Sequence, residues 1–467
     1  MIPLTKTASR RAHKTPVFIM SRRSHSPSLP DIRLAKRPRL DIPPLTSADY
    51  KDGIMLAPMV RSGALPTRLF ALKHGAKLVW GPETVDKAIL HAERSVDPVT
   101  GVVSYNGKTK AIFTTHPIEK PFLIYQIGSA DPELAVQAAK TVMQDVAGFD
   151  LNCGCPKPFS THSGMGAALL SNPDLLCAIL TALRTAMPPE IPISAKIRLL
   201  PSQEDTLKLV ERIVNTGVTA LTVHCRTRSM RMKDKAVIER LREIVEFIEG
   251  LGRDVAVIEN GDCVGFEDAR RIRRITAGAH SVMIATAAEA NPTCFSPTPL
   301  ADLEQTFIPP YIRLARYLDN HWSNTKFCAS QFQGAHVAST KHDAREFRLG
   351  IVRAKEYADV APLAEPWTGA DEFTAIASAI ASRGNVRAPP HVLTLEDVSS
   401  AVLPPEVEGQ ENEALEARPE QVKPPLEAAV PRAPLGAMNE LQVSVSALGN
   451  VVPAFVPAET GLETAAA

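Results

Sequence analysis

The chain has 467 residues and a formal net charge of +1, so it is too long for one ordinary domain and long enough for a large core with appendages. Its apolar runs all fall short of the ~20 residues that a membrane-spanning helix needs, and we expect a soluble protein that does not enter a membrane. The seven cysteines include no Cys-x-x-Cys pair, which argues against a zinc site or a disulfide scaffold and favours reduced thiols inside a cell.

The first 45 residues differ in charge from the rest of the chain. They hold ten Lys and Arg against two Asp and lack periodic apolar positions, so residues 1–45 are expected to form a disordered basic extension. A start without acidic residues allows mitochondrial targeting, whereas the run Lys36-Arg37-Pro38-Arg39 allows nuclear import or RNA contact. A solvated basic tail explains the same residues equally well. We expect a cytoplasmic protein, with a nuclear or mitochondrial location as the open alternatives.

Eight short apolar runs follow, and amphipathic runs long enough for crossover helices separate them. Eight alternating units over ~250 residues are what a (β/α)8 barrel requires. We therefore predict an α/β fold with a TIM barrel at residues 46–300. The predicted strands are 54–57, 77–80, 122–127, 147–151, 193–197, 220–223, 255–258 and 281–285, and the clearest helices are 133–146, 174–185, 204–216 and 237–251.

Polar residues follow these predicted strands, at the end where such a barrel carries its functional groups. A structural core would not place Gln, Lys, His and Asn so regularly after apolar runs, although any one of them alone would more often be a solvated strand end. Together they predict a mouth suited to an aromatic ring bearing carbonyl groups and to a phosphate. These strand ends are 57–60, 126–128, 152–155, 196–198, 224–227, 260–262 and 285–288.

Cys155 lies at one of these junctions, directly before Pro156. A thiol on a strand end can act as an acid, a nucleophile or a ligand when its neighbours tune its pKa. The alternative is a small buried apolar residue, which is the commoner state of a cysteine. The polar, glycine-containing loop 160–166 after it favours a functional thiol, because such loops bring backbone amides close to a ligand.

The segment from Asn152 resembles the N-x-G-C-P-K…G-M-G-A-A-L-L signature of the tRNA-dihydrouridine synthases, most of all the type that modifies position 20 of the D-loop. The resemblance spans roughly Gly53 to Trp367. It implies a flavin-dependent oxidoreductase that reduces uridine to 5,6-dihydrouridine in tRNA, with FMN as cofactor and NADPH or NADH as reductant. In that family the cysteine at the position of Cys155 donates a proton to the uracil ring while reduced FMN donates a hydride.

The resemblance also implies roles for the strand ends. Pro58 and Met59 would lie against the flavin, Gln126 and Lys196 would hydrogen-bond its polar edge, and His224 would help to hold it. The phosphate of FMN would meet Asn260, Gly261, Asp262, Ala285 and Thr286. The tRNA substrate would contact Asn152, Lys157, Arg198 and Arg226. No Gly-x-Gly-x-x-Gly motif is present to hold a dinucleotide permanently, so the nicotinamide cofactor is expected to bind only transiently.

Four positions depart from the family pattern. Thr286 replaces an arginine, Cys225 replaces a glycine, Glu259 replaces a small residue, and His162 stands where lysine is common. The loss of one cation and the gain of a carboxylate near the phosphate predict weakened flavin binding.

After residue 300 the alternating pattern ends, and residues 303–320, 324–339 and 342–357 are predicted helices. The resemblance identifies residues 301–367 as a helical tRNA-contacting domain, with Lys326, Arg345 and Arg348 as contacts. Helices also carry such charges for solubility alone. Residues 368–467 are predicted to be a mostly disordered tail rich in Ala, Pro and Glu.

Two other functions remain open at this point. One is an RNA-binding protein of the same fold with weak or lost flavin catalysis. The other is a barrel like the flavin-dependent dihydroorotate dehydrogenases, acting on a free pyrimidine, although the helical domain and its basic residues argue against it. We expect a monomer.

Overall fold

The computed structural model describes residues 43–276, 278–337, 339–361, 369–383 and 387. Most of the two extensions predicted to be disordered, residues 1–45 and 368–467, therefore lies outside the described residues. Within the described residues, no helix is both long and apolar enough to cross a membrane.

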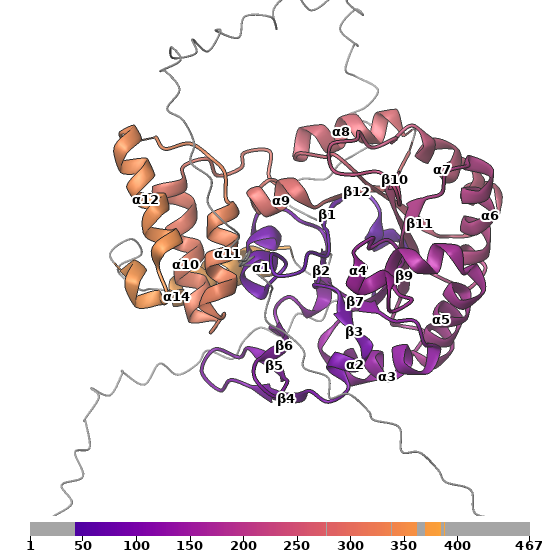
Figure 1. Ribbon diagram of the computed structural model, residues 1–467, viewed down its shortest axis with the longest axis horizontal. Coiled ribbons are helices and arrows are strands. Elements are labelled where there is room, and N and C mark those ends of the chain that lie inside the picture. Colours follow the sequence, from indigo (N-terminus) through magenta and orange to yellow (C-terminus); the bar gives the residue numbers. More distant parts are fainter. Residues whose placement is uncertain (1–42, 277, 338, 362–368, 384–386, 388–467) are drawn as a thin grey trace, which may run out of the picture. The chain divides into compact units, whose positions relative to one another are not determined.

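Eight parallel strands of the described part of the chain form a closed ring (Figure 1). Successive barrel strands pair with one another, and the ring closes through the pairing of β1 with β12 and of β2 with β7. Each of the eight predicted strands is present, so the predicted barrel is confirmed. The strands are β1 (Ile54–Leu56), β2 (Val79–Trp80), β7 (Leu123–Gly128), β8 (Gly148–Asn152), β9 (Ile193–Leu199), β10 (Ala220–Thr227), β11 (Ala256–Asn260) and β12 (Ser281–Ile284).

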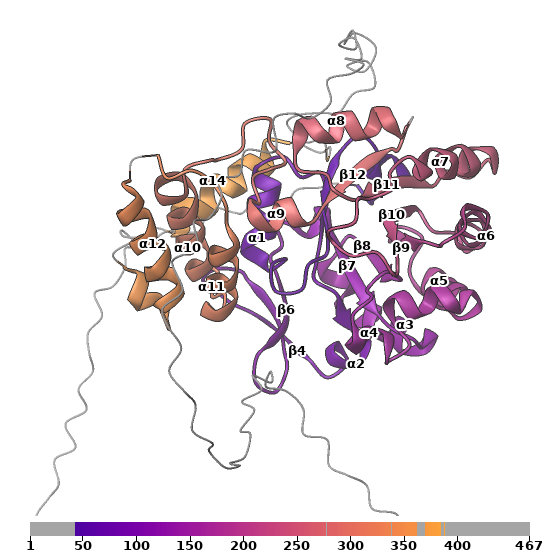
Figure 2. The same ribbon diagram turned by 45° about the horizontal axis from the view of Figure 1, so that its top comes forward.

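The barrel helices lie outside the strands (Figures 1 and 2). Polar side chains cap the starts of three of them: the Asp131 carboxylate accepts from the backbone N–H of Glu133 and Leu134, Asn172 Oδ1 accepts from that of Leu175, and the Ser202 hydroxyl accepts from that of Asp205. Such caps satisfy donors that the first turn leaves unpaired. The helices are α1 (Leu65–Lys73), α3 (Pro132–Val142), α5 (Pro173–Ala186), α6 (Gln203–Val214), α7 (Arg240–Gly250) and α8 (Phe266–Ile275), with the short turns η1 (Ser47–Tyr50), α2 (Asp86–Ile89), η2 (Lys120–Phe122), η3 (Met143–Asp145), α4 (Pro158–Thr161), η4 (Gly166–Ser171) and α9 (Thr286–Ala290) between elements.

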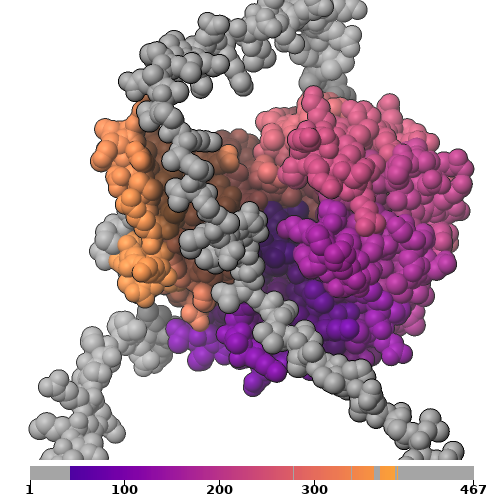
Figure 3. Space-filling view, in the orientation of Figure 1, coloured from indigo at the N-terminus to yellow at the C-terminus, as the bar shows by residue number. Residues whose placement is uncertain are grey.

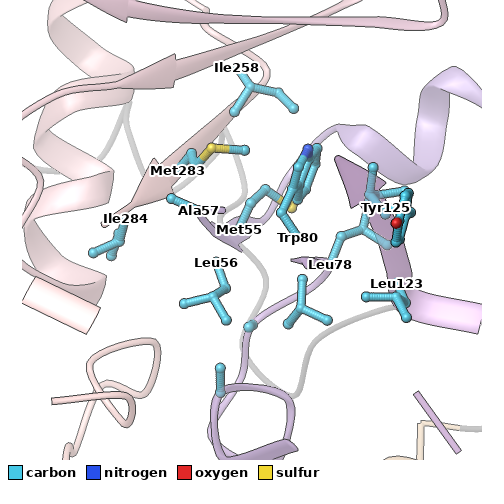
Figure 4. Close-up of a cluster of buried hydrophobic side chains, with 14 of the residues drawn as sticks. Met55, Leu56, Ala57, Leu78, Trp80, Leu123, Tyr125, Ile258, Met283 and Ile284 are labelled. Carbon is cyan, nitrogen blue, oxygen red and sulfur yellow. The ribbon is translucent and has the colours of Figure 1, made fainter. Parts of the chain in front are cut away.

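Large apolar side chains fill the barrel beneath its polar end. Trp80 of β2 is fully buried and lies near Met55, Ile258 and Met283, which come from three other strands (Figure 4). Complete burial of one such side chain contributes about 1.5–3 kcal/mol. This layer therefore holds the ring closed and gives the strand ends above it a rigid base.

The sequence analysis missed a small sheet between the second and third barrel strands. β4 (Glu93–Val96), β5 (Val103–Asn106) and β6 (Ala111–Thr115) pair antiparallel, and the short β3 (Thr84–Val85) pairs with β7. The Arg94 guanidinium attaches the sheet to the barrel, because its Nε and Nη2 donate to the Asp145 carboxylate oxygens at 2.7 Å and 2.9 Å. Its strands are short and mostly polar on one face, so they carry little of the apolar signal on which the strand prediction depended.

Helices follow the barrel, as predicted, but the second one is shorter than expected. α11 (Trp322–Gln331) ends before Phe332, whose backbone is extended. The Phe332 ring is buried and stacks on Phe307 with centroids 4.5 Å apart. This aromatic contact takes the chain out of the helix that the sequence suggested up to residue 339. The other elements are η5, a π-helical turn (Leu303–Phe307), α10 (Ile308–Tyr317), α12 (Lys341–Arg353) and η6 (Tyr357–Val360).

One further helix lies where the sequence analysis expected little core. α14 (Gly369–Ala381) buries Ile376 and Ile380, four residues apart on one face, and packs against α10 and α1. Arg383 follows α14 in the chain. Its guanidinium donates to the carbonyl of Leu72, in the last turn of α1, and to that of Ala76, just beyond this helix. This helix was not predicted from the sequence, because its docking depends on contacts with distant parts of the chain, among them the Arg313–Glu372 ion pair.

Candidate active site

Polar side chains from four barrel strands meet at the carboxyl ends of the strands. The register places Asn152 beside Lys196 and His224 beside Asn260. The Lys196 ammonium donates to Asn260 Oδ1 at 2.8 Å, and Asn260 Nδ2 donates to the Met283 carbonyl at 2.9 Å. The structure thus brings together four of the residues that the sequence placed on separate strand ends. In the space-filling view, the indigo residues that begin the barrel are set back between magenta barrel residues and the orange helical residues (Figure 3).

Lys196 is the cation nearest the centre of this group. Burial, followed by the positive charge of Arg198, lowers the pKa of Lys196 to about 8, while Asp150 and Glu259 act in the opposite direction. The ammonium is therefore charged at pH 7 and loses its proton just above that. A positioned cation in a dry site stabilises negative charge that develops beside it.

Gln126 lies one layer deeper than Asn152. Its Nε2 donates to Asp150 Oδ2 at 2.8 Å, and the Ser194 hydroxyl donates to Asp150 Oδ1 at 2.7 Å. Burial raises the pKa of Asp150 to about 6, against the hydrogen bonds from Gln126 and Ser194. One amide donor of Gln126 is thus committed to the protein, and Asp150 is a polar residue of the barrel interior that the sequence analysis did not single out.

Two arginines and a histidine line the next part of the mouth. Arg198 donates to the Gly154 carbonyl at 2.7 Å and to that of Thr227 at 3.1 Å, and Arg226 pairs with Asp262 and lies 3.4 Å from His224 Nε2. Burial, with the positive charges of Lys196 and the two arginines, lowers the pKa of His224 far below its usual range. His224 is therefore neutral and can accept a hydrogen bond at Nε2.

Cys155 lies on the loop that follows β8 and is half-buried. Asn152 Oδ1 accepts from the backbone N–H of Gly154 at 3.0 Å and of Cys155 at 3.2 Å, and the Ala167 N–H donates to the Cys155 carbonyl at 2.9 Å. Gly166 permits this return of the chain, because it has a positive φ of 58° and a Cβ there would lie 2.7 Å from the Cys155 carbonyl oxygen. The loop therefore holds Cys155 in one place by three backbone hydrogen bonds.

The second cysteine of the motif is in a different position. Cys153 is fully buried, and its Sγ contacts the Leu151 carbonyl at 3.6 Å. Burial raises the pKa of the Cys153 thiol well above its ordinary value. Burial also raises the pKa of Cys155, which is nevertheless half-exposed. Of these two cysteines, only Cys155 reaches the open end of the barrel.

The residues expected around a flavin and its phosphate are spread over three loops. Pro58 and Met59 follow β1 and are half-buried, Gly261 and Asp262 follow β11, and Ala285 and Thr286 follow β12, where Thr286 is exposed. Asp262 accepts from the Ala236 N–H at 2.7 Å as well as from Arg226. The structure thus places all of these residues at the carboxyl end of the barrel.

Glu259 is a buried carboxyl group near this end. It is fully buried, and neither carboxylate oxygen has a hydrogen-bond partner. Burial, with the negative charges of Asp262 and Asp268, raises its pKa well above the ordinary value, whereas Lys196 and Arg226 act in the opposite direction. The raised pKa favours the neutral form of Glu259, which reduces the negative charge that the sequence suggested near the phosphate end.

The residues expected to contact RNA outside the barrel do not form one group. Lys326 of α11 donates to the Ala354 carbonyl at 2.9 Å, at the end of α12. Arg345 is exposed, and Arg348 donates to His336 Nε2 at 3.3 Å. Both arginines line a cavity of about 300 Å³ on α12, with His336, Ala344, Leu349 and Val352. Lys157 is exposed beside Cys155.

Glu83 is a polar residue of the mouth that the sequence analysis missed. It follows β2, the one barrel strand whose end is missing from the predicted site, and it lies against Gly128 at the end of β7. Applying the strand-end rule to all eight strands would have found it.

Comparison with known proteins gives one family. Residues 55–357 match the model of the dihydrouridine synthase family, "Dihydrouridine synthase (Dus)". A Schizosaccharomyces pombe protein named tRNA-dihydrouridine(20) synthase [NAD(P)+] is 48% identical over 291 residues, which is 61% of this chain and 60% of that protein. A Saccharomyces cerevisiae protein of the same name is 44% identical over 301 residues, covering 60% of this chain and 77% of that protein.

A third relative is more distant. The Saccharomyces cerevisiae protein named tRNA-dihydrouridine(20a/20b) synthase [NAD(P)+] is 29% identical over 239 residues, which is 51% of this chain and 60% of that protein. The two relatives with the higher identity carry the name of the position-20 type, and the chain covers three fifths of the length of the first of them.

Proposed function

Since the chain belongs to the dihydrouridine synthase family, we propose that it reduces uridine to 5,6-dihydrouridine in tRNA, at position 20 of the D-loop. The proposal takes FMN as the cofactor and NADPH as the reductant. Its support is the printed name of the two relatives at 48% and 44% identity, which gives position 20 and NAD(P)+, together with the composition of the barrel mouth.

The residues at the mouth fit an isoalloxazine ring. Such a ring offers carbonyl and nitrogen acceptors along one edge, and the side chains at the strand ends are donors, among them the Lys196 ammonium and the Gln126 amide. Lys196, Gln126, Asn260 and His224 would hold that edge, Pro58 and Met59 would face the ring, and the loops with Gly261, Asp262, Ala285 and Thr286 would meet the phosphate. When bound, FMN supplies the hydride that adds to C6 of uracil.

Cys155 carries the proposal within the site. Addition of a hydride at C6 leaves negative charge on C5 and the C4 carbonyl oxygen, and the product requires a proton at C5. Cys155 supplies it: its S–H bond breaks, a C–H bond forms at C5, and a thiolate remains to be reprotonated from water. The half-exposed thiol on a loop fixed by three hydrogen bonds suits this role of general acid.

The target base must leave its stack to reach the thiol, at a cost of a few kcal/mol that is smallest in a flexible loop. Asn152, Arg198 and Arg226 would then contact the extruded nucleotide, and Lys157 the strand beside it. We take residues 46–300 as the FMN-binding barrel and residues 301–367 as the domain whose Lys326, Arg345 and Arg348 contact the tRNA. The exposure of Arg345 favours it as a phosphate contact over Lys326, which already binds the end of α12.

A second candidate function is RNA binding with weak flavin catalysis. Thr286 is exposed at the position where the family pattern has an arginine, and its side chain carries no charge. This reading predicts the same fold and tRNA affinity but little bound flavin.

One experiment separates the two. The full chain is reconstituted with excess FMN and then given NADPH and tRNA from a strain that lacks dihydrouridine at position 20. We expect a stoichiometric flavin absorbance, its bleaching by NADPH and dihydrouridine at position 20. A protein that binds this tRNA but retains no flavin would contradict the proposal and support the second candidate.

A further inference from the structure

Glu83 has no role in the fold that accounts for its position. Its Oε1 atom is sealed from water and has no hydrogen-bond partner. Gly128 makes room for it, because a Cβ on Gly128 would lie 2.6 Å from that oxygen. A carboxylate oxygen held out of water is costly unless it is hydrogen-bonded or paired, so the role of Glu83 depends on the groups that surround it.

Asn152 connects Glu83 to the loop of the proton donor. The Asn152 carbonyl oxygen accepts from the backbone N–H groups of Gly154 and Cys155, so its NH2 group is the end left to face a partner. Glu83 lies against Gly128, which follows Ile127, the register partner of Leu151, so the carboxylate lies beside Asn152 at the neighbouring strand end. Asn152 lowers the pKa of Glu83, against burial, which raises it. Glu83 is therefore placed beside the amide that fixes the backbone of Cys155.

The groups around the Cys155 thiol shift its pKa in opposite directions. Lys157, the backbone N–H of Lys157 and the Ser160 hydroxyl stabilise the thiolate, and Arg198 of β9 interacts with the same sulfur. Burial is the largest influence and disfavours the thiolate, and Glu83 is the carboxylate that acts in the same direction. A thiolate cannot donate a proton, so a general acid beside two cations needs such a counterweight.

We propose that Glu83 is a positioning residue for the proton donor: its carboxylate orients Asn152, which holds the Cys155 loop, and its negative charge opposes the cations Lys157 and Arg198 beside the thiol. The proposal deepens the proposed function and rests on it for the meaning of the thiol. The arrangement itself is tested without tRNA or turnover.

The test compares alkylation of Cys155 by iodoacetamide as a function of pH in the full-length, FMN-reconstituted protein, with the Cys155 peptide quantified by mass spectrometry. Only the thiolate reacts, so the midpoint of the rate profile reports the thiol pKa. In Glu83→Gln, which keeps an acceptor for Asn152 but loses the charge, the profile should move to lower pH. Alkylation at pH 7.5 should be roughly three- to tenfold faster, equivalent to about half to one pKa unit.

Two further variants make the result specific. Glu83→Asp keeps the charge and should give a profile close to that of the wild type, whereas a purely structural role would make both substitutions equally disruptive. Glu93→Gln, on the exposed strand β4, is the matched control and should change nothing. An unchanged profile in Glu83→Gln would overturn the proposal, as would a Glu83→Asp profile that matches that of Glu83→Gln.

The activity assay distinguishes this proposal from the proposed function. If the wild type forms dihydrouridine, the alkaline limb of the rate in Glu83→Gln should move to lower pH together with the alkylation midpoint. A wild type that forms none would refute the proposed function and leave the alkylation comparison valid as the test of Glu83.

Discussion

Cys153 and Cys155 are separated by one glycine, and the end of β8 gives them different surroundings. Cys153 still belongs to the buried layer around the strand, whereas Cys155 lies beyond it, where Asn152 and the 166–167 turn bind its backbone. Because a reactive thiol must be both accessible and held in place, we propose that the chemistry of the motif belongs to the second cysteine. The first contributes to packing.

Thr286 is the residue at which the phosphate end departs from the family pattern, and it is exposed. The variant Thr286→Arg should bind FMN more tightly, because a charge-assisted hydrogen bond to phosphate contributes about 1.5–3 kcal/mol, or roughly 10- to 150-fold in the dissociation constant. Fluorescence titration of the apoprotein with FMN measures this. Thr298→Arg, at an exposed position away from the strand ends, is the control. Equal dissociation constants for Thr286→Arg and the wild type would mean that another residue already supplies the cation.

Glu259 should make the protein less stable as pH rises. Its pKa is raised in the folded state, so between the unfolded value near 4.5 and the folded value the unfolded chain releases a proton that the folded chain retains. The free energy of unfolding then falls with increasing pH, by about 1.4 kcal/mol for each pKa unit of the shift.

The variant Glu259→Gln lacks this titration. The difference between its free energy of unfolding and that of the wild type should therefore grow in favour of the variant from pH 5 to pH 8. Urea unfolding at several pH values measures it. In the control variant Glu249→Gln, on the exposed face of α7, the free energy of unfolding should change with pH as it does in the wild type. If the free energy of unfolding of Glu259→Gln also follows the wild type across this pH range, Glu259 has a partner in solution that offsets the effect of burial on its pKa.

Among the elements, α14 is attached to the barrel by one charged group as well as by its isoleucines. Arg383 is almost fully buried, and its guanidinium donates to the carbonyl of Leu72, in the last turn of α1, and to that of Ala76 just beyond it, where the helix end carries partial negative charge. Arg387 makes a similar contact with the Pro43 and Pro121 carbonyls and pairs with Asp49 at 3.2 Å. These arginines lie outside residues 55–357, the part of the chain that matches the family model, yet they bind the carbonyls of Leu72, Ala76 and Pro121 within it.

The variant Arg383→Met keeps the apolar stem and removes both donors. It should lower the free energy of unfolding by about 2–4 kcal/mol, since hydrogen bonds to a charged group are lost and buried carbonyls are left without partners. The urea midpoint is the measurement, with Arg353→Met on the exposed side of α12 as the control. A midpoint equal to that of the wild type would show that α14 docks without help from Arg383.

At the scale of the molecule, the barrel was predictable because its signal is repeated. Eight apolar runs with helices between them permit few other folds, and each run need only be recognised roughly. The β4–β6 sheet and α14 were not predictable in the same way, because their stability comes from single contacts with distant parts of the chain. Arg94 with Asp145, and Arg383 with α1, are examples that no local pattern contains.

The site was predictable to the extent that strand ends converge. Lys196, Asn260 and Asn152 come together because parallel strands end at one edge of the barrel. The order of the strand ends along the chain can be read directly from the sequence. The sequence does not state which side chains are already engaged, such as Lys326 at the end of α12, or which carboxyl oxygens are buried without hydrogen-bond partners, such as Glu83 Oε1 and those of Glu259. These properties depend on neighbours from other elements.

The central claim is that Cys155 donates the proton to uracil, and substitution of the two cysteines tests it most directly. Dihydrouridine at position 20 would be measured after a single turnover of the FMN- and NADPH-loaded protein with unmodified tRNA. Cys155→Ala should keep flavin binding and flavin reduction by NADPH but form dihydrouridine about 10²–10⁴ times more slowly, and Cys153→Ala should retain the wild-type rate if it folds. Dihydrouridine formation at the wild-type rate in Cys155→Ala would contradict the account.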